Sequence, residues 1–325
     1  MSETLLVVGG AGYIGSHMVK MLALAGHSVV VLDNLSTGFA DAARYGTLVV
    51  GDIADRPFLK TLFTKYTFSG VLHFGAFSQV NQSLRDPAGY YRNNVACSLN
   101  LLDVAVAWGT PPIVFSSTAA VYGEPHKIPI PETHPLSPIN PYGESKRMVE
   151  TILADYERAY GLRWAALRYF NAAGADPDGE LGERHDPETH LIPLVLQTAV
   201  GLRPAISLYG NDYPTPDGTC IRDYVHVEDL CAAHLLALHH LKNGGMSRAW
   251  NLGNGAGFSV TELLATARKI TGCAIPAEIA PRRPGDPARL IADASDAIRI
   301  LDWTPRYPNL ETIIRHAWTW TRKNR

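Results

Sequence analysis

The chain has 325 residues, of which 46% are hydrophobic and 18% are charged, and its formal net charge is −2 at pH 7. This composition excludes a disordered chain and predicts a large core in one large or two ordinary domains. The near-neutral charge excludes the broad basic field by which proteins bind nucleic acid non-specifically or adhere to an anionic membrane.

Short apolar, β-rich runs alternate with longer helical patterns through the first half of the chain. The pattern predicts strands at 5–8, 28–32, 47–50, 70–74, 112–116 and 163–168, and helices near 13–25, 55–65, 87–108 and 141–160. Such alternation implies parallel strands joined by right-handed crossovers, with helices on both faces of the sheet. We therefore predict an α/β fold with a Rossmann-type, doubly wound parallel sheet.

The alternation stops after Phe170. Loops are predicted at 171–188, 210–218 and 280–287, and helices near 190–201, 228–241, 259–271 and 309–322. We predict a first domain over 1–170 and a smaller mixed α/β domain over 171–325, with segments near 222–255 able to return to the first. A segment with six prolines, 125–141, is either a surface loop or a lid over a site.

A glycine-rich turn follows the first predicted strand and opens the first predicted helix. Gly9, Gly12 and Gly15 form a G-x-x-G-x-x-G pattern, which lets the backbone approach a pyrophosphate at the helix N-terminus. Asp33 ends the second strand about 20 residues further on, where a carboxylate accepts hydrogen bonds from ribose hydroxyls and repels a 2′-phosphate. The motif thus predicts NAD rather than NADP, with Asp52 as a candidate for the adenine pocket.

Tyr142 and Lys146 form a Y-x-x-x-K pair at the start of a predicted helix. Asn140 and Pro141 are typical of an N-cap followed by the first helical residue, so the pair lies one turn apart on one helix face. An ammonium beside a phenol lowers the phenol's pKa, which is about 10 when unperturbed. Such a tyrosine can exchange a proton with a hydroxyl group near neutral pH. Thr118, at the end of the fifth strand, is placed to bridge that hydroxyl and the tyrosine.

These motifs resemble the extended short-chain dehydrogenase/reductase superfamily and, within it, the UDP-glucose 4-epimerase family. The likeness covers nearly the whole chain. It rests on GGAGYIGSH (Gly9–His17), Asp33–Leu35, His73–Phe74, Asn93–Val95, Ser116–Gly123, Tyr142–Lys146, LRYFN (Leu167–Asn171), GNDYPTPDG (Gly210–Gly218), IRDYVHV (Ile221–Val227), Asn251–Gly253 and RRPGD (Arg282–Asp286). The blocks in the second half are the more diagnostic, because many reductases share only the cofactor motif.

The resemblance implies an enzyme that interconverts UDP-galactose and UDP-glucose, with NAD held as a prosthetic group. In that family's mechanism the tyrosine that matches Tyr142 removes the proton of the 4-hydroxyl while NAD takes hydride from C4. The 4-keto sugar then turns about its pyrophosphate and receives the hydride on its other face. Thr118 matches the residue that binds the reacting oxygen, and Lys146 matches the lysine that also holds the nicotinamide ribose.

The resemblance also implies two sets of binding residues. The cofactor set is Gly9, Gly12, Tyr13, Ile14, Gly15, Asp33, Asn34, Asp52, Ile53, Phe74, Asn93, Tyr142, Lys146 and Tyr169. The UDP-sugar set is Thr118, Asn171, Leu191, Tyr209, Arg222, Arg283 and Asp286. Arginines suit a diphosphate, an aromatic ring suits uracil, and a carboxylate suits ribose.

Two positions depart from the family's pattern, one near the nicotinamide ribose of the cofactor and one near the sugar. Some epimerases carry a lysine where this chain has Ser78, so no role is assigned to that residue. Leu290 matches a position whose bulk decides whether an N-acetyl group fits. A leucine is of intermediate size, so we expect UDP-glucose and UDP-galactose to be the main substrates.

Three other functions compete with this one. Sister nucleotide-sugar 4,6-dehydratases carry an Asp-Glu pair after the threonine, but here Ala119 and Ala120 stand there and neither transfers a proton. Epimerases of UDP-glucuronate, UDP-xylose or UDP-N-acetylglucosamine remain open. The third function, a non-catalytic NAD-binding sensor, is disfavoured by the intact set of Thr118, Tyr142 and Lys146.

The remaining features predict little further chemistry. His185 and His190 lie in a polar loop and are expected to be solvated, so no metal site is predicted. The four cysteines are widely spaced, no basic N-terminal segment is present, and no apolar run reaches the roughly 18 residues of a membrane span. We therefore expect a cytoplasmic protein with reduced thiols. By resemblance it is a homodimer packed through helices near 87–108 and 141–160.

Overall fold

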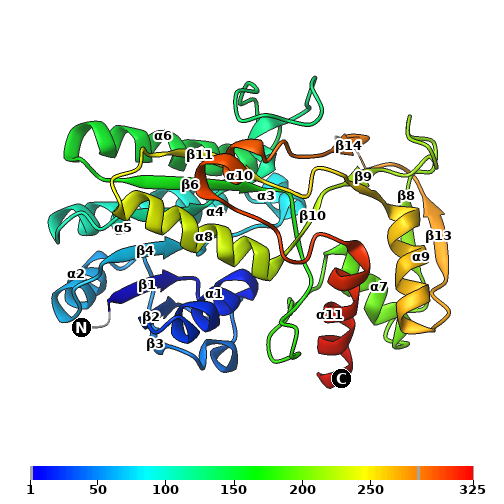
Figure 1. Ribbon diagram of the computed structural model, residues 1–325, viewed down its shortest axis with the longest axis horizontal. Coiled ribbons are helices and arrows are strands. Elements are labelled where there is room, and N and C mark those ends of the chain that lie inside the picture. Colours follow the sequence, from blue (N-terminus) through cyan, green and yellow to red (C-terminus); the bar gives the residue numbers. More distant parts are fainter. Residues whose placement is uncertain (1–2, 284–285, 325) are drawn as a thin grey trace.

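The computed structural model describes residues 3–283 and 286–324. Met1, Ser2 and Arg325, and two residues of the RRPGD motif, Pro284 and Gly285, lie outside the described residues. The described chain forms a large sheet domain and a smaller lobe, which lie side by side in Figure 1.

A seven-stranded parallel sheet forms the first part. Its strands are β1 (Thr4–Val8), β2 (Ser28–Asp33), β3 (Thr47–Val50), β4 (Gly70–His73), β5 (Ile113–Ser116), β6 (Trp164–Tyr169) and β11 (Arg248–Leu252). They lie in the order β11-β6-β5-β4-β1-β2-β3, and every neighbouring pair is parallel. The order reverses between β1 and β4, and at such a point the loops after the two strands diverge and leave room for a ligand. The predicted Rossmann-type class is confirmed.

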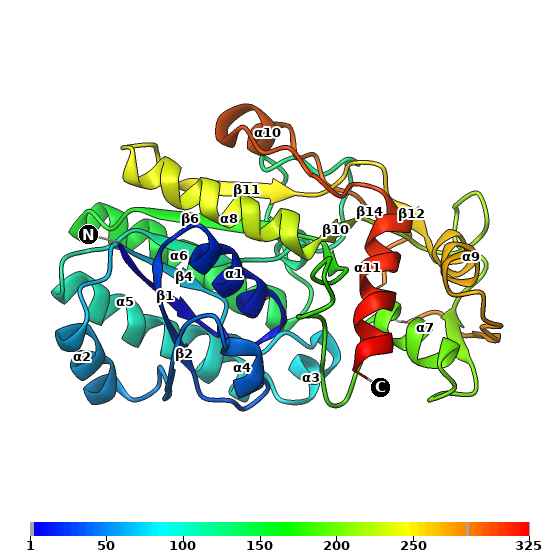
Figure 2. The same ribbon diagram turned by 60° about the horizontal axis from the view of Figure 1, so that its bottom comes forward.

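The apolar strands divide their side chains between two cores. Leu5 and Val7 pack against α1 (Tyr13–Leu24) and α8 (Val227–Lys242) on one face. Leu6 and Val8 pack on the other face, against α2 (Arg56–Lys65), α5 (Cys97–Ala107) and α6 (Pro141–Tyr160). A strand that is buried on both faces has apolar residues at consecutive positions, and β1 has such a run in the sequence. Figure 2 shows α1 and α8 together over the sheet.

The smaller lobe consists of short strands and three helices. The strands form three small sheets: β7 (Asn171–Ala173) with β10 (Tyr224–His226), β8 (Ile206–Tyr209) with β13 (Ala277–Ala280), and β9 (Ile221–Arg222) between β12 (Phe258–Ser259) and β14 (Arg289–Leu290). The helices α7 (Leu191–Ala199), α9 (Val260–Thr271) and α11 (Leu310–Lys323) pack against them around a separate apolar core.

The helical stretch predicted near 87–108 is present without a break, but it contains a π-helical segment that the sequence did not indicate. That region comprises α4 (Pro87–Tyr90), a π-helical segment η2 (Tyr91–Ala96), and α5. A single π turn leaves no signature in the apolar periodicity, and such turns are frequent at functional sites. The sequence prediction also missed α3 (Val80–Arg85) and α10 (Ser295–Leu301), both short helices.

Candidate active site

One cavity of about 720 Å³ lies along the carboxyl ends of the strands and extends from the sheet domain into the smaller lobe. The glycine-rich turn after β1 lines its first end. Gly9 has φ +75°, and a Cβ at Gly15 would lie 2.2 Å from the carbonyl oxygen of Gly9. A side chain at either position would push the turn away from the start of α1, so glycine is required at both.

The start of α1 fits a phosphate group. Gly12 is its N-cap, no side chain caps the helix, and its first turn holds no acidic residue. The N–H groups of a first helical turn have no partner within the helix, and together with the helix dipole they favour an anion.

Asp33 lies beside this turn at the end of β2, where it is buried. Its carboxylate accepts hydrogen bonds from the N–H groups of Ala11 (2.9 Å) and Leu35 (2.8 Å). Two acceptor sites remain on a carboxylate that accepts two N–H groups. Asp52 and Asn34 are hydrogen-bonded to each other at 2.8 Å further along the cavity. The residues present therefore fit a dinucleotide whose ribose lies near Asp33.

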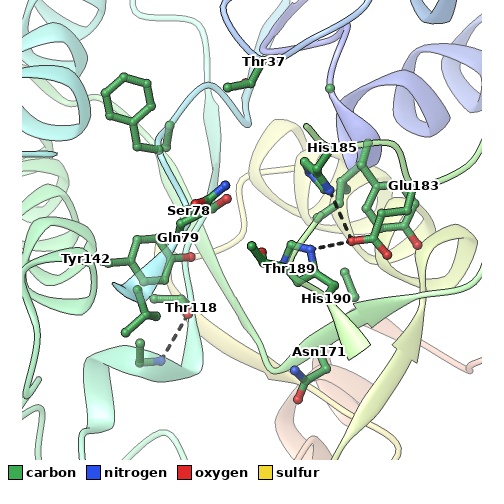
Figure 3. A pocket seen from close by; sticks show the side chains of 18 of the residues that line it. Thr37, Ser78, Gln79, Thr118, Tyr142, Asn171, Glu183, His185, Thr189 and His190 are labelled. Carbon is green, nitrogen blue, oxygen red and sulfur yellow. Dashed lines mark hydrogen bonds and ion pairs between the residues drawn. The ribbon is translucent and has the colours of Figure 1, made fainter. Parts of the chain in front are cut away.

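The second group of residues lies at the middle of the cavity. Tyr142 is in the first turn of α6, which Asn140 caps by accepting from the N–H of Gly143 at 2.8 Å. Thr118 follows β5, and Figure 3 shows its side chain and that of Tyr142 on the same side of the cavity. Lys146 is 3% exposed, and its ammonium donates to the carbonyl oxygen of Ser116 at 2.7 Å. The ammonium lies 5.9 Å from the centre of the Tyr142 ring.

The protein around this group disfavours charge. Burial raises the pKa of Tyr142, and a hydrogen bond with Thr118 lowers it. Burial lowers the pKa of Lys146 to about 7, and the carboxylate of Glu150 acts in the opposite direction. Burial therefore favours the neutral form of both side chains. The pKa of Tyr142 is raised, not lowered as expected from the neighbouring lysine, because burial outweighs the other influences on this phenol.

A buried ion pair holds α6, which carries Tyr142 and Lys146, to the sheet. Glu150, one turn after Lys146, accepts from Nε of Arg168 in β6 at 3.0 Å, and both side chains are less than 8% exposed. Ser117 also donates to this carboxylate at 2.5 Å. The network fixes α6 against β5 and β6, so it sets the distance between Tyr142 and the strand ends.

The π-helical segment η2 ties a second wall to the same helix. Asn94 accepts from the N–H of Phe77 at 2.8 Å, and its amide donates to the carbonyl oxygen of Phe77 and to the hydroxyl of Ser145, each at 3.0 Å. The loop that carries Phe77, Ser78 and Gln79 is thereby held close to α6, and all three residues line the cavity.

The far end of the cavity is polar and aromatic. Arg222 forms an ion pair with Asp286, and the guanidinium of Arg283 lies 3.9 Å from the centre of the Tyr209 ring. These two arginines and Asp286 come from separate segments, β9 and the residues before β14. A guanidinium group can donate two parallel hydrogen bonds to two oxygens of one phosphate, and it can stack on an aromatic ring. This end of the cavity therefore suits a nucleoside diphosphate.

Every residue predicted to bind the cofactor or the sugar nucleotide lines this one cavity. It brings together Gly9, Gly12, Tyr13, Ile14, Gly15, Asp33, Asn34, Asp52, Ile53, Phe74, Asn93, Thr118, Tyr142, Lys146, Tyr169, Asn171, Leu191, Tyr209, Arg222, Arg283 and Asp286. Ser78 and Leu290 line it as well, whereas no residue of the proline-rich segment 125–141 does. Which of the lining residues bind the cofactor and which bind the sugar nucleotide stays a prediction.

Sequence reasoning missed several lining residues and the contacts of two histidines. Thr37, Gln79, Glu183 and Thr189 also line the cavity, and no motif marks the first two. His190 is exposed, as expected, whereas His185 is half-buried, and their Nδ1 atoms lie 2.8 Å and 3.5 Å from Oε1 of Glu183. These contacts were not expected, because they form only when the loop folds back on itself and brings glutamates against the histidines. The E-x-H-x-x-E-x-H spacing of residues 183–190 could have signalled this.

These features define a dinucleotide-dependent enzyme of the Rossmann class with a Thr–Tyr–Lys site facing a nucleotide-binding end. A family model described as "NAD dependent epimerase/dehydratase family" matches residues 5–253. The chain therefore belongs to that family.

Three relatives are particularly similar. A UDP-glucose 4-epimerase of Halalkalibacterium halodurans is 53% identical over 98% of this chain and 96% of its own length. A UDP-glucose 4-epimerase of Brucella ovis solved in complex with NAD is 51% identical, with a TM-score of 0.96 and 98% of each chain covered. One of Bifidobacterium longum, solved with NAD+ and UDP, is 37% identical with a TM-score of 0.94, covering 99% of this chain and 98% of its own.

None of the helices in the described part of the chain combines the length and apolarity that a membrane crossing needs.

Proposed function

We propose that the chain is a UDP-glucose 4-epimerase, which interconverts UDP-galactose and UDP-glucose by transient oxidation at C4 of the sugar. The observation that carries the proposal is the single cavity in which Tyr142, Thr118 and Lys146 lie between the glycine-rich turn and the arginine-rich end. NAD, when bound at the glycine-rich turn, supplies the oxidation and the reduction at C4.

The chain's own residues handle the proton and the position of the sugar. Tyr142 takes the proton of the 4-hydroxyl and later returns it, and the hydroxyl of Thr118 holds the same oxygen. Lys146 is buried beside the tyrosine, and in its protonated form its positive charge stabilises the phenolate of Tyr142. Arg222 and Arg283 hold the diphosphate, Tyr209 the uracil and Asp286 the ribose, while Asn171 and Leu191 complete the wall.

The residues at the glycine-rich end of the same cavity are proposed to bind NAD. The N–H groups at the start of α1 and the turn at Gly9–Gly15 receive the pyrophosphate, and Asp33 receives the adenosine ribose. Asn34, Asp52 and Ile53 surround the adenine. Phe74, Asn93 and Tyr169 complete the wall toward the nicotinamide.

Conversion of UDP-galactose by the purified protein, without added NAD, tests the proposal. Proton NMR is expected to show UDP-glucose, and Tyr142→Phe is expected to slow its formation by about 10²- to 10⁴-fold, because the variant lacks the proton-transferring oxygen. Tyr66→Phe is a matched control, since Tyr66 follows α2 and does not line the cavity. Undiminished C4 inversion in Tyr142→Phe would contradict the proposed role.

We also propose that the protein is a cytoplasmic homodimer that packs through α4–α5 and α6. The hydroxyl of Tyr156 in α6 donates to Asp103 in α5 at 2.5 Å, so the two helices present one joint face. Trp108 and Tyr160, exposed at the ends of these helices, supply apolar surface. Light scattering on the purified protein checks the oligomeric state, and cell fractionation checks the location.

A further inference from the structure

A cluster of two histidines and two glutamates lies on the loop between β7 and α7, at the rim of the cavity. Glu183, His185, Glu188 and His190 each offer one ligand atom, and these atoms all lie within 4.8 Å of one another. We infer that this cluster is a binding site for a divalent transition metal ion of the zinc type. The inference goes beyond the proposed function and does not depend on it.

Three of the four histidine-to-glutamate distances in the cluster are close to the ligand separations of a four-coordinate metal. Nδ1 of His185 lies 3.5 Å from Oε1 of Glu183 and 3.5 Å from Oε2 of Glu188. Nδ1 of His190 lies 2.8 Å from Oε1 of Glu183 and 3.2 Å from Oε1 of Glu188. Zinc bonds of about 2.0–2.2 Å to nitrogen and oxygen place tetrahedral ligand atoms roughly 3.3–3.5 Å apart. Ligand atoms at these separations need little movement to enclose an ion.

One ligand atom has no hydrogen-bond partner. Nδ1 of His185 is buried and makes no hydrogen bond to any described residue, although it faces both carboxylates. An unpaired buried imidazole nitrogen is costly unless something satisfies it. A metal ion at the centre of the cluster satisfies this atom and both carboxylates together.

Charge in the cluster also points to a cation. The side chains of Glu183 and Glu188 are only 7% and 5% exposed, and among the described residues no lysine or arginine pairs with either. The intervening arginine, Arg184, turns away to pair with Asp41 at 2.6 Å. The two nearly buried carboxylates therefore contact imidazoles rather than fixed cations, and a divalent ion bound by all four side chains would balance their two negative charges.

The surroundings hold the ligands in place. Oε1 of Glu188 accepts from the N–H groups of Thr189 (2.7 Å) and His190 (2.8 Å) where α7 begins. The carbonyl of Glu183 accepts from the indole of Trp320 in α11 at 3.2 Å. The two ends of the cluster are thus fixed to two different helices of the smaller lobe. Outer contacts of this kind orient metal ligands.

The ligand set selects the class of metal. Two imidazoles with two carboxylates suit Zn²⁺ and its neighbours in the first transition series, whereas Mg²⁺ and Ca²⁺ prefer all-oxygen sites. Figure 3 shows His185 and His190 directed toward Glu183, across the cavity from Tyr142. A metal ion here would pin the segment that leads into Leu191, so its role is to hold that wall of the cavity.

Zinc binding to the purified, EDTA-treated and desalted protein tests the inference. Equilibrium dialysis with elemental analysis is expected to find one zinc ion per chain, not displaced by excess Mg²⁺. The double substitution His185→Gln with His190→Gln is expected to weaken binding at least ~10-fold. The matched control, His239→Gln with His240→Gln on α8, is expected to bind as the unaltered chain does.

A second variant and a second measurement guard against loss of folding. Glu188→Gln keeps an oxygen for the N–H groups of Thr189 and His190 but removes the charge, so it is expected to fold and to bind zinc more weakly. Zinc is expected to raise the melting temperature of the unaltered chain and not that of the double variant. Co²⁺ bound in place of zinc is expected to give the intense visible bands of four-coordinate cobalt.

Failure of the unaltered chain to take up stoichiometric zinc would overturn the inference. So would equal affinity in the folded double variant. Neither result bears on epimerase activity, because none of these measurements uses a sugar nucleotide.

Discussion

Lys146 is placed to act on Tyr142 without being able to reach water. Its ammonium lies over the ring of Phe115 at 4.8 Å, donates to Ser116, and is buried in the protein. Burial lowers the pKa of this lysine to about 7, so its charge near neutral pH depends on groups that face it. In the proposed mechanism only the protonated lysine stabilises the phenolate of Tyr142.

Leu290 is the residue by which we expect the substrate to be selected. It lies in β14, opposite Arg222 of β9, and packs against the small apolar cluster around Val121 and Tyr122. Leu290→Ala removes bulk from the cavity wall, so it is expected to raise kcat/KM for UDP-N-acetylglucosamine relative to UDP-glucose by roughly 10-fold or more.

Initial rates with both sugars measure this change. Leu202→Ala, at a residue that is 70% exposed and does not line the cavity, is the control. If the ratio of kcat/KM for the two sugars is unchanged in the Leu290 variant, another part of the cavity wall determines whether the N-acetyl group fits.

For individual residues, the sequence allowed prediction of which side chains line the site, but not of which residues those side chains contact. Tyr142 and Lys146 could be found because their spacing places them on one helix face. The partners of Arg222, Arg283 and Asp33 could not, because each partner comes from a segment distant in the chain or from the backbone. The contacts between the histidines and glutamates of residues 183–190 could not be predicted for the same reason: only the folded loop brings Glu183 and Glu188 against them.

Helix α6 carries the proposed catalytic residues Tyr142 and Lys146, and Glu150, its anchor to the sheet, lies one turn after Lys146. Glu150→Gln leaves Arg168 buried opposite a neutral side chain, so it is expected to lower the free energy of unfolding by about 3–5 kcal/mol. Urea denaturation of the variant and the unaltered chain measures the difference.

Glu144→Gln is the matched control on the same helix. Its partner Arg147 is 38% exposed, so the ion pair is worth about 1 kcal/mol or less. Equal losses in the two variants would mean that the buried pair does not anchor α6.

Among the elements, the sequence predicted the strands and long helices of the sheet domain well. Strands β1 to β6 and helices α1, α2 and α6 are long enough to show a period, and caps such as Asn140 mark their ends. The strands of the smaller lobe are two to four residues long, too short for any pattern. The π turn at η2 interrupts a helix whose apolar residues continue, so the sequence shows no break there.

The two parts of the molecule are joined by segments that return to the sheet. Strand β11 pairs with β6, and α8 packs on the sheet face beside α1, although both follow β7 to β10 in the chain. The division at residue 170 stays a prediction. The returning strand adds a seventh member to the sheet and fixes the smaller lobe against the carboxyl ends, where the cavity lies.

The whole molecule holds several buried histidines in the neutral form. Burial lowers the pKa of His17 and His234 to about 4 and that of His73 and His226 to about 3. The unfolded chain takes up these protons near pH 6.5, and the folded chain does not. The stability that these groups provide is present above about pH 6.5 and is lost as the pH falls toward their folded values.

His226→Gln tests this linkage. His226 is fully buried, and its Nε2 atom shares a hydrogen bond of 2.9 Å with Nδ1 of His316. Between about pH 6 and pH 4, the unfolding free energy of the variant is expected to fall less steeply than that of the unaltered chain, by up to about 1.4 kcal/mol per pH unit. Urea denaturation across this range measures both slopes, and parallel slopes would mean that His226 is protonated in the folded chain.

The central claim is that one cavity oxidises and reduces the same carbon of the sugar. The most direct measurement follows UDP-galactose that carries deuterium at C4, incubated with the purified protein in ordinary water and without added NAD. The account predicts UDP-glucose that retains deuterium at C4, seen by NMR and mass spectrometry. Replacement of the deuterium by solvent hydrogen during inversion would contradict it, because C4 would then exchange a proton rather than pass through oxidation.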